Sequence, residues 1–128
     1  MHGSLNDQAL IYLQIAQMLE DDILRGVYLE EEQVPSTNEL AREYNINPAT
    51  AAKGINLLVA EGVLYKRRGI GMFVAPGATA AVKEKRRKAL GEEYVLPLLR
   101  EAKSLGLGKE ELLAMVKEAI EHEGGEKA

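Results

Sequence analysis

Three groups of polar and basic residues between Pro35 and Gly71 have the types and spacing needed to contact duplex DNA. Two groups begin expected helices and the third lies in an expected hairpin: Ser36, Thr37 and Asn38; Asn47, Ala49, Thr50 and Lys53; Lys66, Arg67, Arg68 and Gly69. The N-terminus of a helix offers N–H groups to phosphates, and its first residues can reach base edges in the major groove. Together, the three groups predict contacts to phosphates and bases.

Each residue type suits a particular contact. Thr50 can donate to a phosphate or touch a thymine methyl group, and Ala49 can touch the same methyl group. Lys53 can reach a phosphate or a guanine edge, whereas Asn47 is either a contact or only a helix cap. In the hairpin, the bare backbone of Gly69 permits close approach, so Arg68 beside it can enter a narrow minor groove.

Two strong helix starts position the first two groups. Ser36 is followed three residues later by Glu39, which is the pattern of a capping box. Asn47 is a good N-cap and Pro48 suits the first helical position of a second helix, which is expected to end at Gly62. Because only a few residues separate these helices, they are typical of a helix-turn-helix.

The flanking elements complete a winged helix-turn-helix. Strands at residues 63–67 and 72–75, joined by a turn with two glycines, predict a basic hairpin. Apolar residues at helical spacing predict a helix over residues 9–25 that ends at Gly26. The acidic connection at residues 28–34 is expected to hold at most a short extended piece.

The chain is expected to divide at Pro76-Gly77 into a DNA-binding domain of residues 1–76 and a tail of residues 77–128. The tail should form a long helix that Pro97 kinks, followed by a shorter helix over residues 109–122. Two helices are too few to enclose an effector, although they suffice for a dimerisation arm. The expected fold class is α+β, mainly α, with a winged helix-turn-helix followed by this short two-helix dimerisation tail.

Composition excludes several functions. The chain has 128 residues and no cysteine, so disulfides and thiolate metal sites are excluded. His2 and His122 lack the spacing of metal ligands, and no Ser/His/Asp set or carboxylate pair predicts catalysis. We therefore expect no enzyme activity, metal or cofactor. Without a membrane-length apolar run or a signal-peptide pattern, the protein is expected to be soluble and cytoplasmic.

Charge leaves two functional classes open. Residues 1–76 contain six basic and ten acidic side chains, so this part carries the whole net charge of −4. A DNA-binding face must therefore be local, and non-specific DNA affinity should be weak. A winged-helix module that binds another protein is the alternative, and the acidic total favours it slightly. An unknown small-molecule effector also stays open, although no convergent set of polar residues predicts its site.

Several short motifs occur in a fixed order between residues 11 and 74. They are Ile11-Tyr12-Leu13-Gln14-Ile15, Ile23-Leu24-Arg25-Gly26, Pro35-Ser36, Glu39-Leu40-Ala41, Asn47-Pro48-Ala49-Thr50, Glu61-Gly62, Arg68-Gly69-Ile70-Gly71 and Phe73-Val74. This pattern resembles the DNA-binding domain of the GntR family of bacterial transcriptional regulators, and the short tail resembles its YtrA subfamily. The resemblance implies a homodimer, a palindromic operator and repression of a nearby operon, often one that encodes an ABC transporter.

The resemblance also implies where the DNA contacts lie. They would fall on Asn38, Asn47, Ala49, Thr50, Lys53, Arg68 and Gly69. Asn38 and Ala52 stand where many family members have arginine, so two bidentate guanine readers are missing, each worth ~1–3 kcal/mol of base discrimination. We therefore expect this protein to depend more on its hairpin and less on guanine contacts than many relatives do.

Overall fold

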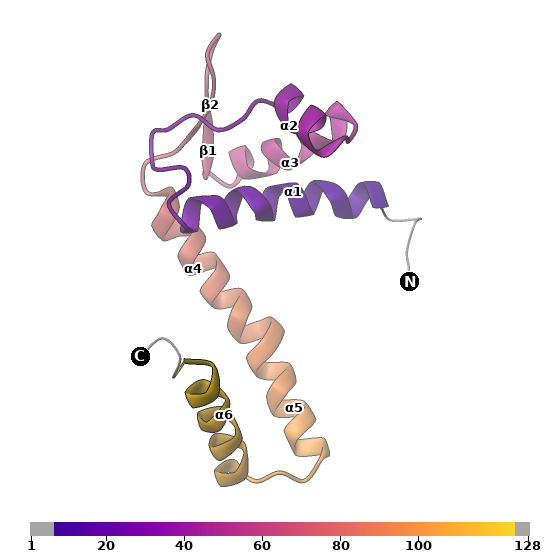
Figure 1. The fold of residues 1–128 in the computed structure, drawn as a ribbon, viewed down its shortest axis with the longest axis vertical. Coiled ribbons are helices and arrows are strands. Elements are labelled where there is room, and N and C mark those ends of the chain that lie inside the picture. Colours follow the sequence, from indigo (N-terminus) through magenta and orange to yellow (C-terminus); the bar gives the residue numbers. More distant parts are fainter. Residues whose placement is uncertain (1–6, 125–128) are drawn as a thin grey trace. The chain divides into compact units, whose positions relative to one another are not determined.

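The computed structural model describes residues 7–124, which form two compact units that divide after Lys85. The first unit contains three helices and a two-stranded antiparallel sheet (Figure 1). These elements are α1 (Asp7–Leu24), α2 (Thr37–Tyr44), α3 (Pro48–Ala60), β1 (Leu64–Arg67) and β2 (Gly71–Val74). Helix α4 (Ala78–Leu90) begins in the first unit. The second unit continues with the π-helical turn η2 (Gly91–Val95), α5 (Leu96–Ser104) and α6 (Lys109–Gly124). The fold class is the expected one, mainly helical with a small hairpin.

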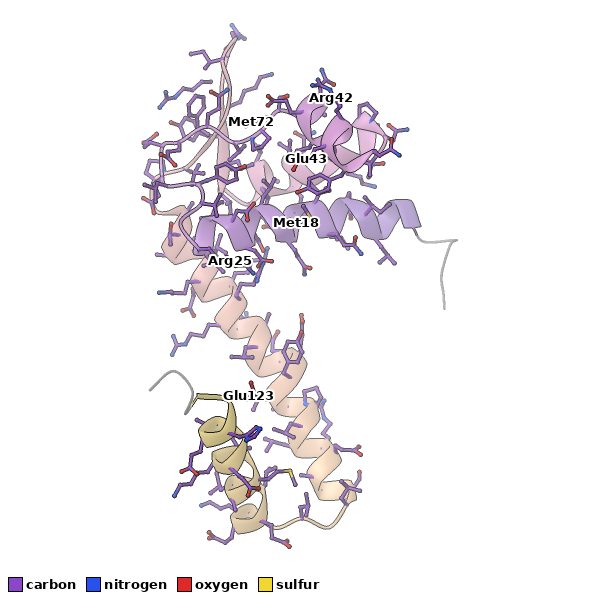
Figure 2. All side chains as sticks on the ribbon, in the orientation of Figure 1. Met18, Arg25, Arg42, Glu43, Met72 and Glu123 are labelled. Atoms are coloured by element: carbon purple, nitrogen blue, oxygen red, sulfur yellow. The ribbon has the colours of Figure 1, made fainter. Side chains whose placement is uncertain are left out.

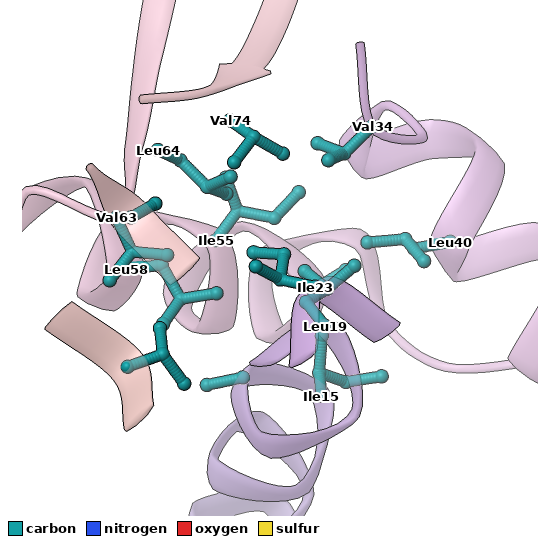
Figure 3. Packing of buried hydrophobic residues seen from close by; sticks show 14 of the residues in the cluster. Ile15, Leu19, Ile23, Val34, Leu40, Ile55, Leu58, Val63, Leu64 and Val74 are labelled. Atoms are coloured by element: carbon teal, nitrogen blue, oxygen red, sulfur yellow. The ribbon is translucent and has the colours of Figure 1, made fainter. Parts of the chain in front are cut away.

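An aliphatic core holds the first unit together (Figure 3). Ile15, Leu19 and Ile23 form the inner stripe of α1, as the helical spacing of the sequence predicts. Ala16 joins them from α1, and the other buried members come from the later elements of the unit and the segments between them: Val34, Leu40, Ala41, Ala51, Ile55, Leu58, Val63, Leu64, Val74, Ala78 and Val82. Burial of this apolar surface is the main force that holds α2, α3 and the hairpin against α1.

Local hydrogen bonds fix the starts of the helix-turn-helix. The Ser36 hydroxyl accepts the Glu39 N–H at 3.0 Å, and the Glu39 carboxylate accepts the Ser36 N–H at 2.8 Å, which confirms the capping box. The Asn47 side chain accepts the Ala49 N–H at 2.7 Å and caps α3. Between the helices, Asn45 takes a left-handed conformation with φ of 52° and ends α2.

The hairpin pairs with a third, short segment of chain. Leu64 lies opposite Val74 and Arg67 lies opposite Gly71 in the antiparallel register. Gln33 forms an isolated bridge with Phe73 on the outer edge of β2. This bridge is the extended piece expected in the acidic connection, and it covers an edge that would otherwise be open.

The first unit extends beyond the Pro76-Gly77 pair at which the sequence placed the boundary. Ala78 and Val82 on α4 are buried in the core. One turn later, the Lys85 ammonium lies 2.6 Å from a carboxylate oxygen of Glu20 and 2.9 Å from one of Glu61. The first half of α4 thus completes the core, because the three helices and the hairpin leave apolar surface that only this helix covers.

Lys85 compensates for a buried charge. Only 2% of the Glu20 side chain is exposed, whereas about half of the Lys85 side chain reaches solvent. Burial by itself lowers the pKa of Lys85, but hydrogen bonds and charge attraction from Glu20 and Glu61 outweigh it and raise that pKa above its ordinary value. The ion pairs therefore join α4 to α1 and to the end of α3.

Glu30 caps the start of α4. Its carboxylate accepts the N–H groups of Gly77 at 2.9 Å and Thr79 at 3.3 Å. These two backbone hydrogen bonds lower the pKa of Glu30, because they favour its ionised form. A residue of the acidic connection thus fixes the beginning of a helix that lies far along the chain.

The second unit contains a helical register shift next to Pro97. The expected kink takes the form of the π-helical turn η2, in which the Leu96 N–H bonds to the carbonyl of Gly91. Pro97 has no N–H and its ring would clash with the carbonyl four residues earlier. The wider turn removes this conflict by placing Pro97 in the first turn of α5.

Apolar side chains of the second unit are largely exposed. Ala102 is buried, but many larger residues have more than a third of their surface in solvent: Leu90, Tyr94, Val95, Leu96, Leu98, Leu99, Leu105, Leu113, Met115, Val116 and Ile120. Such a large apolar surface is uncommon on a monomer and typical of an interaction surface. No helix within residues 7–124 has both the length and the apolar character that a membrane crossing requires.

We expect Lys85→Met to lower the free energy of unfolding by about 1–3 kcal/mol, because it removes the cation that lies 2.6 Å from the buried Glu20 carboxylate. Urea denaturation followed by circular dichroism measures this change. Lys83→Met is the matched control, since Lys83 is exposed on the same helix. Equal stabilities of the two variants would contradict the role given to Lys85.

The same pair of variants tests the pH dependence. The folded pKa of Lys85 lies above the ordinary 10.5, so its contribution to stability is complete below that value and is lost as the pH rises through the folded pKa. We expect the stability advantage of the wild type over Lys85→Met to shrink in alkaline solution. An advantage that stays constant through this range would contradict the prediction.

Candidate nucleic-acid interface

Helix α3 presents one polar face to solvent. Ala49, Lys53 and Asn56 are all exposed. Their spacing of four and three residues places them on one side of the helix. Asn56 was not among the contacts predicted from the sequence. Its position seven residues after Ala49, two helical turns along, would have placed it on the same face. An amide side chain can pair with adenine, so this face offers Asn56 and Lys53 to base edges or phosphates.

Thr50 lies on a different side of α3 from Ala49. Only 9% of its surface is exposed, and its backbone N–H donates to the Asn47 carbonyl at 2.9 Å. Successive residues of a helix are rotated by roughly 100°, so neighbouring positions cannot share the centre of one face. A DNA contact by Thr50 stays a prediction, whereas Ala49 beside it is exposed.

The middle of α3 packs closely on α1 at Gly54. A Cβ atom added at Gly54 would lie 2.8 Å from the Tyr12 carbonyl oxygen and 3.1 Å from the Ile15 side chain. Lys53 lies beside this contact, with its ammonium 4.5 Å from the centre of the Tyr12 ring. Gly54 thereby permits the approach of the helices, and Tyr12 holds the Lys53 side chain by a cation–π contact.

The start of α2 supplies the second predicted group. Ser36 and Asn38 are exposed, whereas Thr37 is half-buried. The hydroxyl of Ser36 and the side-chain oxygen of Asn47 are both engaged as helix caps. Arg42, also exposed, lies on the outer side of α2, away from α1 (Figure 2). Of the predicted contacts at the start of α2, Asn38 is therefore exposed and does not cap the helix.

The tip of the hairpin depends on its two glycines. Gly69 has a φ of 77° and Gly71 a φ of 147°, both in a region that L side chains rarely adopt. The Gln33 amide donates to the Ile70 carbonyl at 2.9 Å and lies where a Cβ of residue 71 would be. Arg68 is exposed beside this supported turn. The bare backbone expected at Gly69 is present, since nothing lies within 4 Å of a Cβ built there.

The register of the hairpin separates its basic side chains onto two faces. Lys66 lies opposite Met72, on the face that continues the buried pair Leu64 and Val74. Arg67 lies on the other face, because successive side chains of a strand alternate. Within residues 7–124 the structure gives no ion pair to Lys66. Lys66 thus offers a cation on the core-side face of the hairpin.

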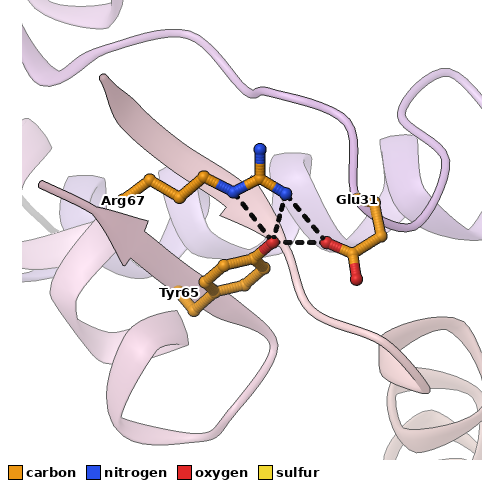
Figure 4. Close-up of polar contacts among 3 residues, drawn as sticks. All are labelled: Glu31, Tyr65 and Arg67. Carbon is orange, nitrogen blue, oxygen red and sulfur yellow. Dashed lines mark hydrogen bonds and ion pairs between the residues drawn. The ribbon is translucent and has the colours of Figure 1, made fainter. Parts of the chain in front are cut away.

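Arg67, a predicted DNA contact, is engaged within the hairpin (Figure 4). Its guanidinium lies 4.1 Å from the centre of the Phe73 ring and donates to the Tyr65 hydroxyl at 2.8 Å. It also forms an ion pair with Glu31 at 3.3 Å, and the Tyr65 hydroxyl donates to the same carboxylate oxygen. No local sequence pattern predicts this cluster, since Glu31 lies far from Arg67 along the chain.

The described residues contain little that could hold a small ligand. No group of three or more histidine, cysteine or acidic side chains within residues 7–124 is placed to bind a metal ion. An open hollow of about 610 Å³ lies along α6, and one helix alone lines it: Glu111, Ala114, Met115, Lys117, Glu118 and Glu121. A surface of this shape does not enclose a molecule, so an effector site remains a prediction without a location.

Comparison with known proteins supports the DNA-binding interpretation. Residues 11–74 match the family described as bacterial regulatory proteins, gntR family. The chain is 46% identical over 65 residues to the "Probable fructoselysine utilization operon transcriptional repressor" of Escherichia coli (strain K12), covering 51% of this chain and 27% of that one. It thus spans about a quarter of that relative.

Two further relatives are similar over nearly the whole chain. The "HTH-type transcriptional repressor YtrA" of Bacillus subtilis (strain 168) is 30% identical over 118 residues, with 91% of this chain and 90% of that protein covered. The crystal structure of a GntR-family regulator from Bacteroides thetaiotaomicron has a TM-score of 0.74 and 38% identity, over 88% of this chain and 98% of that one. The similarity therefore includes the tail.

We expect Gly54→Ala to lower the free energy of unfolding by about 1–3 kcal/mol, because the added methyl meets the rigid Tyr12 backbone rather than a movable side chain. Gly91→Ala is the matched control: a Cβ there meets nothing within 4 Å, so its better helix propensity should stabilise by up to ~1 kcal/mol. Chemical denaturation measures both variants. A Gly54→Ala protein as stable as wild type would show that α1 and α3 do not need this close contact.

Proposed function

Because the chain belongs to the GntR family of bacterial regulatory proteins, we propose that this DNA-binding transcriptional regulator is a homodimeric repressor of a palindromic operator. The observation that carries the proposal is the pairing of an exposed polar face on α3 with a glycine-turn hairpin tipped by Arg68. The relatives are regulators rather than enzymes, and two of them carry the word repressor in their names.

In the proposed complex, α3 enters the major groove and the hairpin follows the neighbouring minor groove. Ala49, Lys53 and Asn56 face the bases and phosphates, while Asn38 contacts the backbone from α2. Arg68 and the bare backbone at Gly69 lie in the minor groove, with Lys66 on a flanking phosphate. With Asn38 and Ala52 in place of arginines, the hairpin supplies a larger share of the binding than in many relatives.

The apolar surface of the second unit supports the homodimer. Leu96 and Leu99 on α5 and Ile120 on α6 each have 44–63% of their surface exposed. A second copy of this surface would remove these side chains from water. We propose that residues 1–76 bind DNA and residues 77–128 dimerise, with the first turns of α4 packed in the core of the DNA-binding unit. Two copies would then contact two half-sites of a palindrome.

The regulated genes are proposed from resemblance to the YtrA subfamily. We place the operator near an operon that encodes a transporter of the ABC class, and we place the protein in the cytoplasm, where the chromosome is. A second candidate function, a winged-helix module that binds another protein, is favoured only by the net charge of −4. Salt-dependent binding to a palindrome upstream of its own gene separates the two, because phosphate contacts release counterions.

We expect Arg68→Ala to weaken operator binding by about 5- to 150-fold, which corresponds to ~1–3 kcal/mol for an arginine contact in a groove. A gel shift with the upstream region of the gene measures the change. Arg25→Ala is the matched control, because Arg25 is equally an exposed arginine but lies at the end of α1, apart from the hairpin (Figure 2). An Arg68→Ala protein that binds like Arg25→Ala would remove the hairpin from the interface.

We expect Leu99→Gln to shift the protein from dimer toward monomer and to weaken operator binding, because a polar group would occupy the apolar surface of α5. Sedimentation equilibrium of the full chain measures the change. Glu101→Gln is the control, since it lies on the opposite side of the same helix. A wild-type protein that stays monomeric at micromolar concentration would contradict the proposed homodimer.

A further inference from the structure

Arg67 is the one basic side chain of the hairpin for which the structure, within residues 7–124, shows an ion pair. Phe73 lies against one face of its guanidinium, the Tyr65 hydroxyl accepts its Nε and one Nη at 3.2 and 2.8 Å, and Glu31 accepts the same Nη at 3.3 Å. These contacts use both the π face and the hydrogen-bonding edge of the guanidinium. Arg67 therefore has less freedom to reach a phosphate than Lys66 or Arg68.

Glu31 is held in place independently of Arg67. Its backbone N–H donates to the Val74 carbonyl at 2.8 Å, which ties it to β2. Its φ of 72° is uncommon for a residue other than glycine, so the surrounding hydrogen bonds must maintain this conformation. The Tyr65 hydroxyl also donates to its carboxylate. The backbone of Glu31 is thus fixed, and its half-exposed carboxylate is directed to Tyr65 and Arg67.

Arg67 is also well placed to reach DNA if it were released. It is the last residue of β1 and directly precedes the Arg68-Gly69 tip. About 44% of its side chain is exposed, so it can leave the cluster without unfolding the hairpin. A phosphate and the Glu31 carboxylate are both oxyanions that bind a guanidinium edge, and they therefore compete for the same group.

We propose that Glu31 is a positioning residue that withholds Arg67 from DNA phosphates and so lowers the sequence-independent, salt-dependent part of DNA affinity. This inference rests on the proposed function, because it concerns the same hairpin and the same ligand. In this arrangement two hairpin cations, Lys66 and Arg68, bind DNA, while Arg67 supports the Tyr65 and Phe73 side of the sheet. The cluster sets how many phosphates the hairpin neutralises.

The test measures the affinity of each variant of the whole chain for a random-sequence DNA duplex. Fluorescence anisotropy reports this affinity at several salt concentrations. Neutralising one more phosphate steepens the slope of log K against log salt by ~0.9, so affinity would change about eight-fold more per ten-fold change in salt. Glu31→Gln should show this steeper slope. The double variant Glu31→Gln/Arg67→Met should return to the wild-type slope, because the released cation is then absent.

Two controls separate release of Arg67 from a simple loss of negative charge. Glu32→Gln removes the same charge one residue away, where the carboxylate accepts the Leu29 N–H rather than a contact from Arg67. It should leave the slope unchanged. Tyr65→Phe leaves the net charge and the Glu31 ion pair unchanged but removes the hydroxyl that accepts two hydrogen bonds from Arg67, so it should steepen the slope by less than Glu31→Gln does.

The outcomes distinguish the two levels of proposal. A wild-type protein with no salt-dependent affinity for any duplex would overturn the proposed function itself. Clear wild-type binding with a slope that falls by ~0.9 in Arg67→Met alone would overturn only the inference, because Arg67 would then already contact a phosphate. Equal behaviour of Glu31→Gln and Glu32→Gln would overturn it as well. Circular dichroism of each variant confirms that the hairpin-bearing unit is folded.

Discussion

The contact between the backbone of α1 at Tyr12 and the bare Cα of Gly54 on α3 determines how the first unit is built. A Cβ at residue 54 would meet both the Tyr12 carbonyl oxygen and the Ile15 side chain, so any larger residue here would force the two helices apart. The inner stripe of α1 then meets Ile55 and Leu58 on the adjacent turn. With α3 held in this position, its outward face is defined, and the Lys53 side chain on that face reaches back to within 4.5 Å of the centre of the Tyr12 ring.

Features that depend on neighbouring residues could be predicted from the sequence. The capping box at Ser36 and the Asn47-Pro48 helix start are local patterns, and both occur as expected. Both ends of each hairpin strand were predicted to within one residue, because the glycines mark the turn between them. Pro97 also predicts a break in the tail helix. That this break is a π-helical turn depends on how the helix relieves the clash between the proline ring and an upstream carbonyl.

Features that depend on distant contacts could not be predicted in this way. The DNA contact of Thr50 stays a prediction, but its low exposure depends on how α3 is rotated against the core. Arg67 looked like its basic neighbours, yet Glu31 and Phe73 engage it from other segments. The core also needs Ala78 and Val82 from α4, beyond the Pro-Gly pair that resembles a boundary. Each of these outcomes is set by which surfaces meet in three dimensions.

The acidic connection between α1 and α2 has four consecutive residues with four different partners. Glu30 caps α4, Glu31 binds Arg67, the Glu32 carbonyl accepts the Val74 N–H, and Gln33 supports the hairpin turn. Surface loops ordinarily tolerate insertions and deletions. Here, one added or deleted residue would displace the following side chains from their partners and disrupt several of these contacts together. The length of this segment should therefore vary as little as that of a core helix, although its acidic composition is typical of a solvated surface loop.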